Sequence, residues 1–221
     1  MARPVARSGG SRVLRVTEWL SSSYHREVLG SPSSSVRVTP AEFLAMERTS
    51  PSKHQLWNGE IFSMAGASLS HNLIVGNITR LLGNLVLDGP CVVLPSDMKV
   101  FVPLTKGYVY PDVSVVCEEP ELLEEQADVI GNPVVIVEVL SESTELFDRG
   151  DKFAGYRSLR SVMDYVLVDQ SRTRVEHYAR QDDETWVLRV LDAEGALRLQ
   201  TVPGSISTAE IYRKVPLPAE R

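Results

Sequence analysis

The sequence predicts a mixed β-sheet flanked by helices, in a protein of the α/β (α+β) class. Three observations support this fold class. Residues 133–140 form an apolar run of mostly β-branched residues, which is typical of a strand buried on both faces. Residues 69–87 carry apolar side chains at helical spacing and end at Asp88-Gly89-Pro90. Shorter strand-like blocks lie before and after these segments, so strands and helices are interspersed along the chain.

Helix and turn signals place the first elements. Thr39-Pro40-Ala41-Glu42 has the cap residue, the proline and the acid of a helix start, and we expect this helix to run to about residue 48. Residues 55–64 surround Asn58-Gly59, which favours a type I′ hairpin. Further strands are expected at 91–94, 98–102, 109–116, 133–140, 164–168, 175–179 and 186–191. Further helices are expected at 69–87, 146–159 and 207–215, with an acidic turn or helix at 120–126.

Length and composition indicate one globular domain with an extension. The chain has 221 residues, 43% hydrophobic and 24% charged, which is enough for a substantial core. No apolar run approaches the roughly 20 residues of a membrane-spanning helix, and no secretory segment is evident. We therefore expect a cytoplasmic protein with no membrane contact. Cys91 and Cys117 lie in or beside apolar runs, and we expect both to be reduced core residues.

Charge is unevenly distributed along the chain. Residues 1–38 hold six Arg and two Glu, whereas the whole chain has a net charge of −6. The acidic remainder disfavours a protein that coats nucleic acid through bulk charge, but it does not exclude a nuclease with a local basic patch. We expect residues 1–38 to be mostly disordered, residues 39–215 to form the domain and residues 216–221 to form a tail. A brief helix or strand at 13–20 stays open, and so does the extension's role as linker, over-long start, DNA-contacting tail or transit peptide.

Two acids and a lysine suggest metal-dependent phosphodiester chemistry. Glu138 lies inside the apolar strand, where a carboxylate is costly unless it meets a cation, a proton or a metal. Asp112 lies at another strand end, and Lys152 lies in the helix that follows. Asp148 and Tyr156 stand four residues before and after Lys152, so the three share one helical face. On neighbouring strands, the two acids could bind Mg²⁺ or Mn²⁺, which usually takes one or two protein carboxylates.

Each of these residues also has a purely structural interpretation. Asp112 could cap a turn or face solvent, and Lys152 could be a solvated helix lysine paired with Asp148. Glu138 is hardest to explain in this way, because its burial demands a partner. If the set is catalytic, Lys152 neutralises developing negative charge or orients the attacking water.

Several motifs occur along the chain in a specific order. They are residues 58–68, His71-Asn72, Pro111-Asp112, residues 138–144, residues 148–156 and residues 164–169. Together they resemble the Uma-type restriction endonuclease family of the PD-(D/E)XK nuclease superfamily. The resemblance implies a restriction-endonuclease-like fold and Mg²⁺-dependent cleavage of double-stranded DNA, with a homodimer as an expectation of the same origin. Leu140 stands where the superfamily has its lysine, and in this branch that lysine lies in the following helix, here Lys152.

One position departs from the family pattern. Gln55 stands where the family commonly has an acid near the metal. A glutamine offers a carbonyl oxygen but no charge, so we expect weaker metal binding or the loss of a second metal. Glu60 on the same hairpin is a candidate substitute or a solvent-facing residue. His71 at a helix start is a candidate phosphate ligand or has a packing or capping role.

Two other functions remain open from the sequence. The chain could be a catalytically weakened or inactive nuclease-fold protein that serves as a DNA-binding or protein-interaction module, which Gln55 and the acidic balance favour. It could also be an RNA or nucleotide phosphodiesterase, because such a site recognises phosphate rather than sugar.

Overall fold

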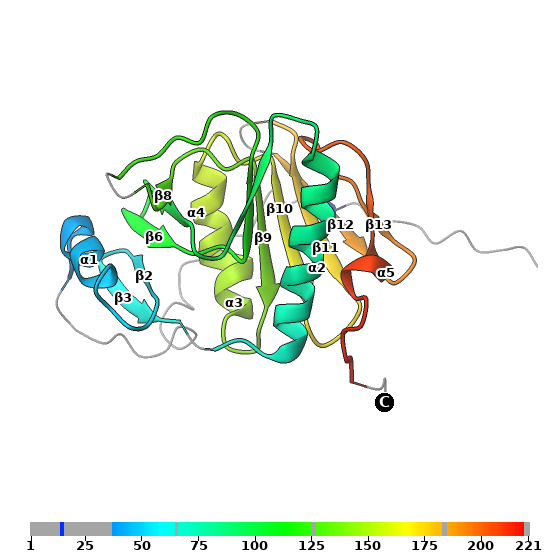
Figure 1. Ribbon diagram of the computed structural model, residues 1–221, viewed down its shortest axis with the longest axis horizontal. Helices are drawn as coiled ribbons and strands as arrows, with labels where there is room; N and C mark the ends of the chain where they lie inside the picture. The colour runs from blue at the N-terminus through cyan, green and yellow to red at the C-terminus, as the bar shows by residue number, and fades with distance from the viewer. Residues whose placement is uncertain (1–13, 16–36, 65, 125–126, 183–184, 219–221) are drawn as a thin grey trace, which may run out of the picture.

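A seven-stranded mixed sheet forms the centre of the protein (Figure 1). The computed structural model describes residues 14–15, 37–64, 66–124, 127–182 and 185–218. The sheet has the strand order β1-β12-β11-β10-β9-β7-β4, in which β9 and β10 are parallel and the other described pairs are antiparallel. The predicted fold class is therefore confirmed. Its strands are β1 (Leu14–Arg15), β4 (Val92–Pro95), β7 (Val113–Val116), β9 (Val135–Leu140), β10 (Asp164–Asp169), β11 (Val175–Arg180) and β12 (Trp186–Leu191).

Helices cover both faces of this sheet, and strand alternation decides which side chains meet each of them. The long helix α2 (Leu69–Val86) covers one face, where it packs on the odd-numbered residues of β9. The other face carries α3 (Glu145–Phe147), a π-helical turn (Asp148–Lys152) and α4 (Phe153–Ser158). There Ile136 and Leu140 of β9 join the core beneath α4. Because all six residues of β9 are buried, the prediction of a strand covered on both faces is confirmed.

A second, five-stranded sheet has the order β3-β2-β6-β5-β8 and is covered by α1 (Pro40–Glu47). Thr39 caps α1 in a reciprocal capping box with Glu42, as predicted. Asn58 and Gly59 have φ angles of 51° and 81°, so the chain makes the left-handed turn that the hairpin requires. The strands of this sheet are β2 (His54–Trp57), β3 (Glu60–Ser63), β5 (Lys99–Val102), β6 (Gly107–Val109) and β8 (Val129–Ile130).

The single strand predicted at residues 109–116 is wrong. The chain forms β6 in the small sheet, leaves it at Tyr110, and enters the large sheet as β7 at Val113. Pro111 lies between the two strands and has no N–H group, so the chain cannot continue one regular ladder through it. As a result, Asp112 lies at the junction of the two sheets.

The prediction that both cysteines are reduced is also wrong. Cys91 and Cys117 are joined by a disulfide bond. The antiparallel register of β4 and β7 pairs Val92 with Val116, so the next residues outward are the two cysteines. Neither strand alone indicates this pairing, because it depends on the register between them.

The remaining elements differ from prediction mainly in their bounds. β1 pairs with β12, so part of the stretch at 13–20 is a strand of the large sheet, while residues 1–13, 16–36 and 219–221 lie outside the described residues. Residues 120–124 form no helix, and Leu122 instead bridges to Ile130. The final helix, α5 (Thr208–Ile211), is shorter than predicted and follows the β13 (Ala196–Leu197) and β14 (Ile206–Ser207) pair. Within the described residues, no helix has the length and apolarity to cross a membrane.

Candidate active site

Strand register brings the two predicted acids together. β7 runs antiparallel to β9, and Val113 pairs with Val137 at the end of their ladder. One step further, Asp112 stands opposite Glu138, and opposite residues in such a pair have Cβ atoms roughly 4.5–5.5 Å apart. The Asp112 carboxylate accepts a hydrogen bond from the backbone N–H of Val139 at 2.7 Å. Asp112 thereby anchors itself to β9 beside Glu138.

Glu138 receives two hydrogen bonds on the same oxygen. Lys152 Nζ donates to Glu138 Oε1 at 3.0 Å, and the Tyr156 hydroxyl donates to it at 2.8 Å. The Glu138 side chain is almost fully buried. Burial raises the pKa of the Glu138 carboxyl to about 8, against the opposing effect of Lys152 and with the support of Asp148 and Asp112. Two neighbouring carboxylates and a dry environment thus favour the protonated form of Glu138.

The π-helical turn presents Lys152 to the carboxylates of Glu138 and Asp148. Lys152 Nζ forms an ion pair with Asp148 at 3.1 Å from Oδ1, an oxygen that is buried and has no hydrogen-bond partner among the described residues. The Tyr165 hydroxyl donates to the backbone carbonyl of Asp148 at 2.8 Å, which holds the turn against β10. Burial lowers the pKa of the Lys152 ammonium, but Asp148 and Glu138 outweigh this effect, and the net pKa is raised. The shared face expected for Asp148, Lys152 and Tyr156 is therefore observed.

His71 adds a group from the opposite face of the sheet. Its backbone N–H donates to Ser68 Oγ, so its position near the start of α2 follows from helix capping. Its side chain nevertheless reaches the site, with Nε2 3.2 Å from Asp112 Oδ2. Within the described residues, the buried His71 Nδ1 has no hydrogen-bond partner. The capping role and the site role that the sequence left open are thus both compatible with this one position.

Gln55 and Glu60 have different surroundings although they share the β2–β3 hairpin. Gln55 lies two residues before Trp57 on β2, so the two side chains project from the same face. Trp57 packs edge-on against Phe147 of α3 at a centroid distance of 5.2 Å, so this face is turned toward the helical segment of the site. Gln55 Oε1 is buried without a hydrogen-bond partner among the described residues. Glu60 is exposed at the start of β3 and joins none of these contacts.

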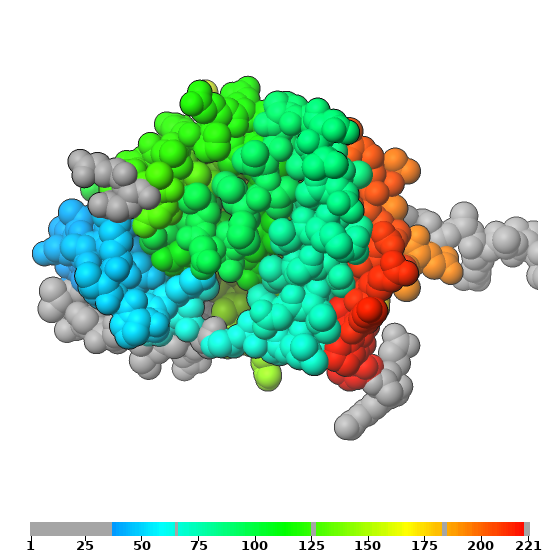
Figure 2. Space-filling model, in the orientation of Figure 1, coloured from blue at the N-terminus to red at the C-terminus, as the bar shows by residue number. Residues whose placement is uncertain are grey.

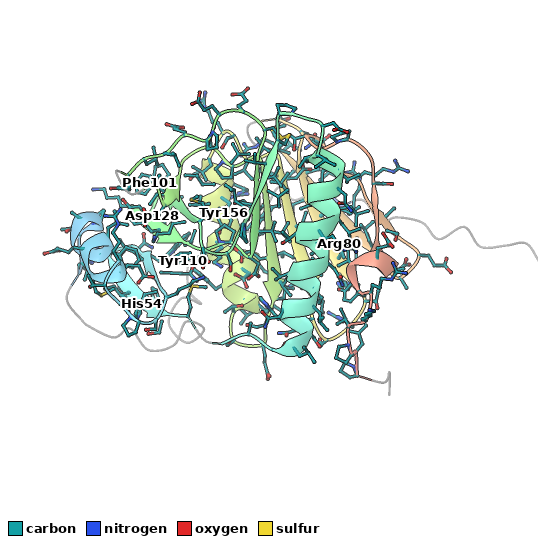
Figure 3. The ribbon with its side chains drawn as sticks, viewed as in Figure 1. His54, Arg80, Phe101, Tyr110, Asp128 and Tyr156 are labelled. Atoms are coloured by element: carbon teal, nitrogen blue, oxygen red, sulfur yellow. A yellow bond between two sulfur atoms is a disulfide. The ribbon has the colours of Figure 1, made fainter. Side chains whose placement is uncertain are left out.

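A buried polar network supports the segment that carries Asp112. Glu47 Oε1 accepts hydrogen bonds from the Tyr110 hydroxyl and the His54 backbone N–H, each at 2.9 Å. Glu47 Oε2 lies 3.0 Å from His54 Nδ1. Tyr110 stands two residues before Asp112, and His54 stands beside Gln55, so α1 braces both the β2 strand and the junction (Figure 3). No sequence pattern indicated Glu47, Tyr110 or Tyr165, because their contacts join distant segments.

The candidate site lies at one edge of the large sheet, where β9 ends and α2 begins (Figure 1). Figure 2 shows the surface hollowed between the blue-to-cyan α1–β3 segment and helix α2, with yellow-green atoms of the α3–α4 segment visible inside. Within the described residues, no group of three or more His, Cys, Asp and Glu side chains is arranged to hold a metal. A pair of carboxylates still fits Mg²⁺, which completes its shell with waters and substrate phosphate.

One family of known proteins matches most of this chain. The profile of the Uma2 family, described as "Putative restriction endonuclease", matches residues 40–210. The chain belongs to the Uma2 family. The resemblance inferred from the motifs is therefore confirmed, and the match spans every residue of the candidate site.

Relatives of this Uma2 chain include two proteins of Synechocystis. The uncharacterized protein sll1609 is 38% identical over 159 residues, which cover 72% of this chain and 90% of that protein. The uncharacterized protein slr1290 is 34% identical over 177 residues, which cover 80% of this chain and 92% of that protein.

A solved structure supports the fold. It is the crystal structure of "a putative nuclease belonging to DUF820" from Anabaena variabilis, with a TM-score of 0.65 and 17% sequence identity. The match covers 79% of this chain and 97% of that chain. At this identity the likeness shows a common fold, and the roles of individual residues need their own argument.

Proposed function

We propose that this Uma2 protein is a metal-dependent endonuclease that hydrolyses DNA phosphodiester bonds. Asp112 and Glu138 would hold Mg²⁺ or Mn²⁺, and Lys152 would stand beside the reacting phosphate. One observation carries the proposal. The strand register places Asp112 opposite Glu138, and Lys152 Nζ lies 3.0 Å from Glu138 Oε1. Membership of the Uma2 family, described as "Putative restriction endonuclease", supports the same chemistry.

The residues around Glu138 orient its carboxylate. Lys152 and Tyr156 both donate to Oε1, so the carboxylate plane is fixed and the other oxygen lies outside this hydrogen-bond set. Asp112 is held in the same way by the Val139 N–H. When bound, the metal supplies Lewis-acid polarisation of the phosphoryl oxygen and a lowered pKa for the attacking water. Positions fixed in advance are what such a site requires, because reorganisation during the reaction is costly.

Lys152 acts as a cation in this proposal. Asp148 and Glu138 raise the pKa of its ammonium, so it stays protonated at neutral pH and is poorly suited to accept a proton. A compact positive charge beside the phosphate stabilises the negative charge that develops there. Asp148 serves as a positioning residue, because it holds Lys152 without facing Asp112 in any described contact.

Metal titration and DNA cleavage together test the proposal. We expect calorimetry to detect Mg²⁺ or Mn²⁺ binding to the wild type, and we expect Glu138→Ala and Asp112→Asn to abolish it. Asp112→Asn should also abolish cleavage of plasmid DNA, whereas Asp88→Asn, an exposed acid beyond α2, should cut as the wild type does. Equal cleavage by wild type and Asp112→Asn would show that the assignment is wrong. Titrations repeated with an oligonucleotide cover the case in which DNA phosphate completes the metal's shell.

Gln55 favours a second candidate function, a nucleic-acid-binding module that no longer cleaves. Its amide, of which the oxygen is buried, brings no charge to the face turned toward the site, where an acid would strengthen metal binding. Absence of metal binding with and without oligonucleotide, together with retained DNA binding, would select this alternative. Dimerisation, a preference for double-stranded DNA and a cytoplasmic location stay predictions.

A further inference from the structure

Three arginines gather beside the candidate site. Arg149 lies in the π-helical turn next to Asp148, and its guanidinium contacts the Glu176 carboxylate. Arg174 Nε donates to the other oxygen of Glu176 at 2.7 Å. Arg172 Nε donates to Asp169 Oδ2 at 2.7 Å. These arginines, which we call the arginine cluster, take no part in the chemistry proposed above.

The arginine cluster lies at the same sheet edge as the two acids. β9 and β10 are parallel, and their ladder ends with Leu140 opposite Asp169. The turn from β10 to β11 therefore begins beside Leu140, the last residue of β9, which is two residues beyond Glu138. Ser68, the cap of α2, also donates to Gln170 in this turn.

The turn that carries Arg172 and Arg174 is held in one shape. Asp169 Oδ1 accepts hydrogen bonds from the Ser171 N–H at 2.9 Å and the Ser171 hydroxyl at 2.7 Å. The Tyr212 hydroxyl lies between the two ends of the turn, 2.7 Å from the Asp169 carbonyl and 2.8 Å from the Arg174 carbonyl. The two arginines are therefore presented from a preorganised loop, which reduces the entropy lost on binding.

The acids that pair with Arg172 and Arg174 are more buried than the two arginines. The carboxylates lie inside, with side-chain exposures of 5% for Glu176 and 11% for Asp169. The guanidinium groups lie outside, with exposures of 38% for Arg174 and 61% for Arg172. Each acid fixes one edge of a guanidinium, and the planar fork retains further N–H donors for a partner. Arg172 and Arg174 thus present positive charge outward, although the chain carries a net charge of −6. Arg149 contributes less to it, because its Nε donates at 2.8 Å to Glu145, whose side chain is 42% exposed.

We propose that the arginine cluster binds the phosphodiester backbone of the nucleic acid and aligns it across the edge that holds Asp112 and Glu138. This inference rests on the proposed function for its substrate. Its ligand is phosphate in a polymer, because arginine forks match phosphate oxygens and the cluster flanks the acids on one side. Contacts of this kind position the substrate without reading its sequence.

Binding in the absence of cleavage tests this inference. We would measure the fluorescence anisotropy of a labelled DNA duplex over a range of salt concentrations, with EDTA present, for wild type and Arg172→Ala/Arg174→Ala. Removal of two phosphate contacts should weaken binding at least about tenfold and make the salt slope shallower by about 1 to 2. The double variant should fold, because Glu176 keeps Arg149 and Asp169 keeps Ser171. Thermal melting checks this expectation.

Two matched variants separate charge from structure. Arg172→Lys/Arg174→Lys keeps the charge and should retain most of the salt slope. Arg80→Ala removes one exposed charge from α2, roughly 16 Å along the helix axis from its start, and should bind DNA as the wild type does (Figure 3). A duplex of RNA in place of DNA distinguishes the two sources of the same backbone chemistry.

The outcomes distinguish this inference from the proposed function. Wild-type affinity and salt slope in the Arg172→Ala/Arg174→Ala variant would overturn the inference, and so would a wild type that binds neither duplex. If Asp112→Asn loses cleavage while the double variant binds normally, the inference alone fails. If the wild type cleaves nothing but binding still depends on the two arginines, the inference holds and the proposed catalysis fails.

Discussion

Opposing effects act on the protonation of the Glu138 carboxyl. Its carboxylate is buried beside Asp112 and Asp148, which disfavour a further negative charge, while Lys152 favours it. A carboxyl in such a place is costly for the metal-free protein, and the cost is typical of residues kept for function rather than stability. We therefore expect the stability of the protein to depend on pH through Glu138, even without substrate.

The metal-free protein should lose stability as pH rises from about 5 to about 8. The folded pKa of Glu138 is about 8, above its ordinary value of 4.5, so between these values the folded state binds the extra proton. Each pH unit in this window should lower the free energy of unfolding by at most about 1 kcal/mol. Urea unfolding in EDTA should show a flatter pH dependence for Glu138→Gln than for wild type. Identical slopes would contradict the raised pKa.

Gln55 offers a test of the missing acid. Gln55→Glu places a carboxylate on the face of β2 that is turned toward the site, so we expect Mg²⁺ to bind more tightly, by about tenfold. The buried charge should also lower the stability of the metal-free protein. Glu60→Gln, at an exposed position of the same hairpin, is the control and should leave the metal affinity unchanged. An unchanged dissociation constant in Gln55→Glu would argue against a metal near this position.

The helical segment that carries Lys152 owes its position to a close approach to β2. Gly155 in α4 faces the Trp57 ring, and a Cβ atom there would overlap the ring and lie 3.1 Å from Val102. Gly150 in the π-helical turn has nothing within 4 Å of the corresponding point. Of the two glycines, only Gly155 is required by packing. The π-helical turn itself accounts for the irregularity.

Two alanine substitutions should separate these roles. Gly155→Ala should destabilise the protein by about 1–3 kcal/mol, because the added methyl group forces Trp57 or α4 to move. Gly150→Ala should be neutral or stabilise by up to about 1 kcal/mol, because alanine reduces the backbone entropy of the unfolded chain. Chemical denaturation measures both. Equal effects of the two substitutions would show that the Trp57 contact is not limiting.

At the scale of the whole molecule, the two ends of the strands in the large sheet have different roles. Asp112 precedes β7, and Cys117 follows it, so the candidate site and the disulfide lie at opposite ends of the same strand. The site edge collects β9, the start of α2, the helical segment and the arginine cluster. At the opposite ends of the strands, the disulfide bond between Cys91 and Cys117 links the outermost strand β4 to its neighbour β7.

Reduction of the disulfide should lower stability without affecting the site. The bond closes a loop with a sequence separation of 26, and loss of such a constraint costs about 3 kcal/mol in the chain-entropy account. We expect a reductant to lower the melting temperature of the wild type but not that of Cys91→Ser/Cys117→Ser. Metal affinity should be the same in both. Two free thiols in the untreated, denatured wild type would contradict the bond.

Local signals in the sequence predicted those parts of the fold that depend on near neighbours. The capping box at Thr39, the turn at Asn58-Gly59, the amphipathic helix α2 and the buried strand β9 all follow from short-range chemistry. The division of residues 107–116 between two sheets did not follow, because one apolar stretch is compatible with either sheet. The disulfide was missed for the same reason, since register is a property of two strands.

By itself the sequence determined the chemical groups of the candidate site: an acid in a buried strand, an acid after a proline, and a lysine at helical spacing from Asp148. Only the tertiary structure decided that these groups meet. Register places Asp112 opposite Glu138, and the π-helical turn directs Lys152 to the carboxylates of Glu138 and Asp148. Parallel pairing of β9 with β10 brings the arginines to the same side of the molecule. Side-chain chemistry is local to a residue, whereas proximity between distant segments depends on how the whole core packs.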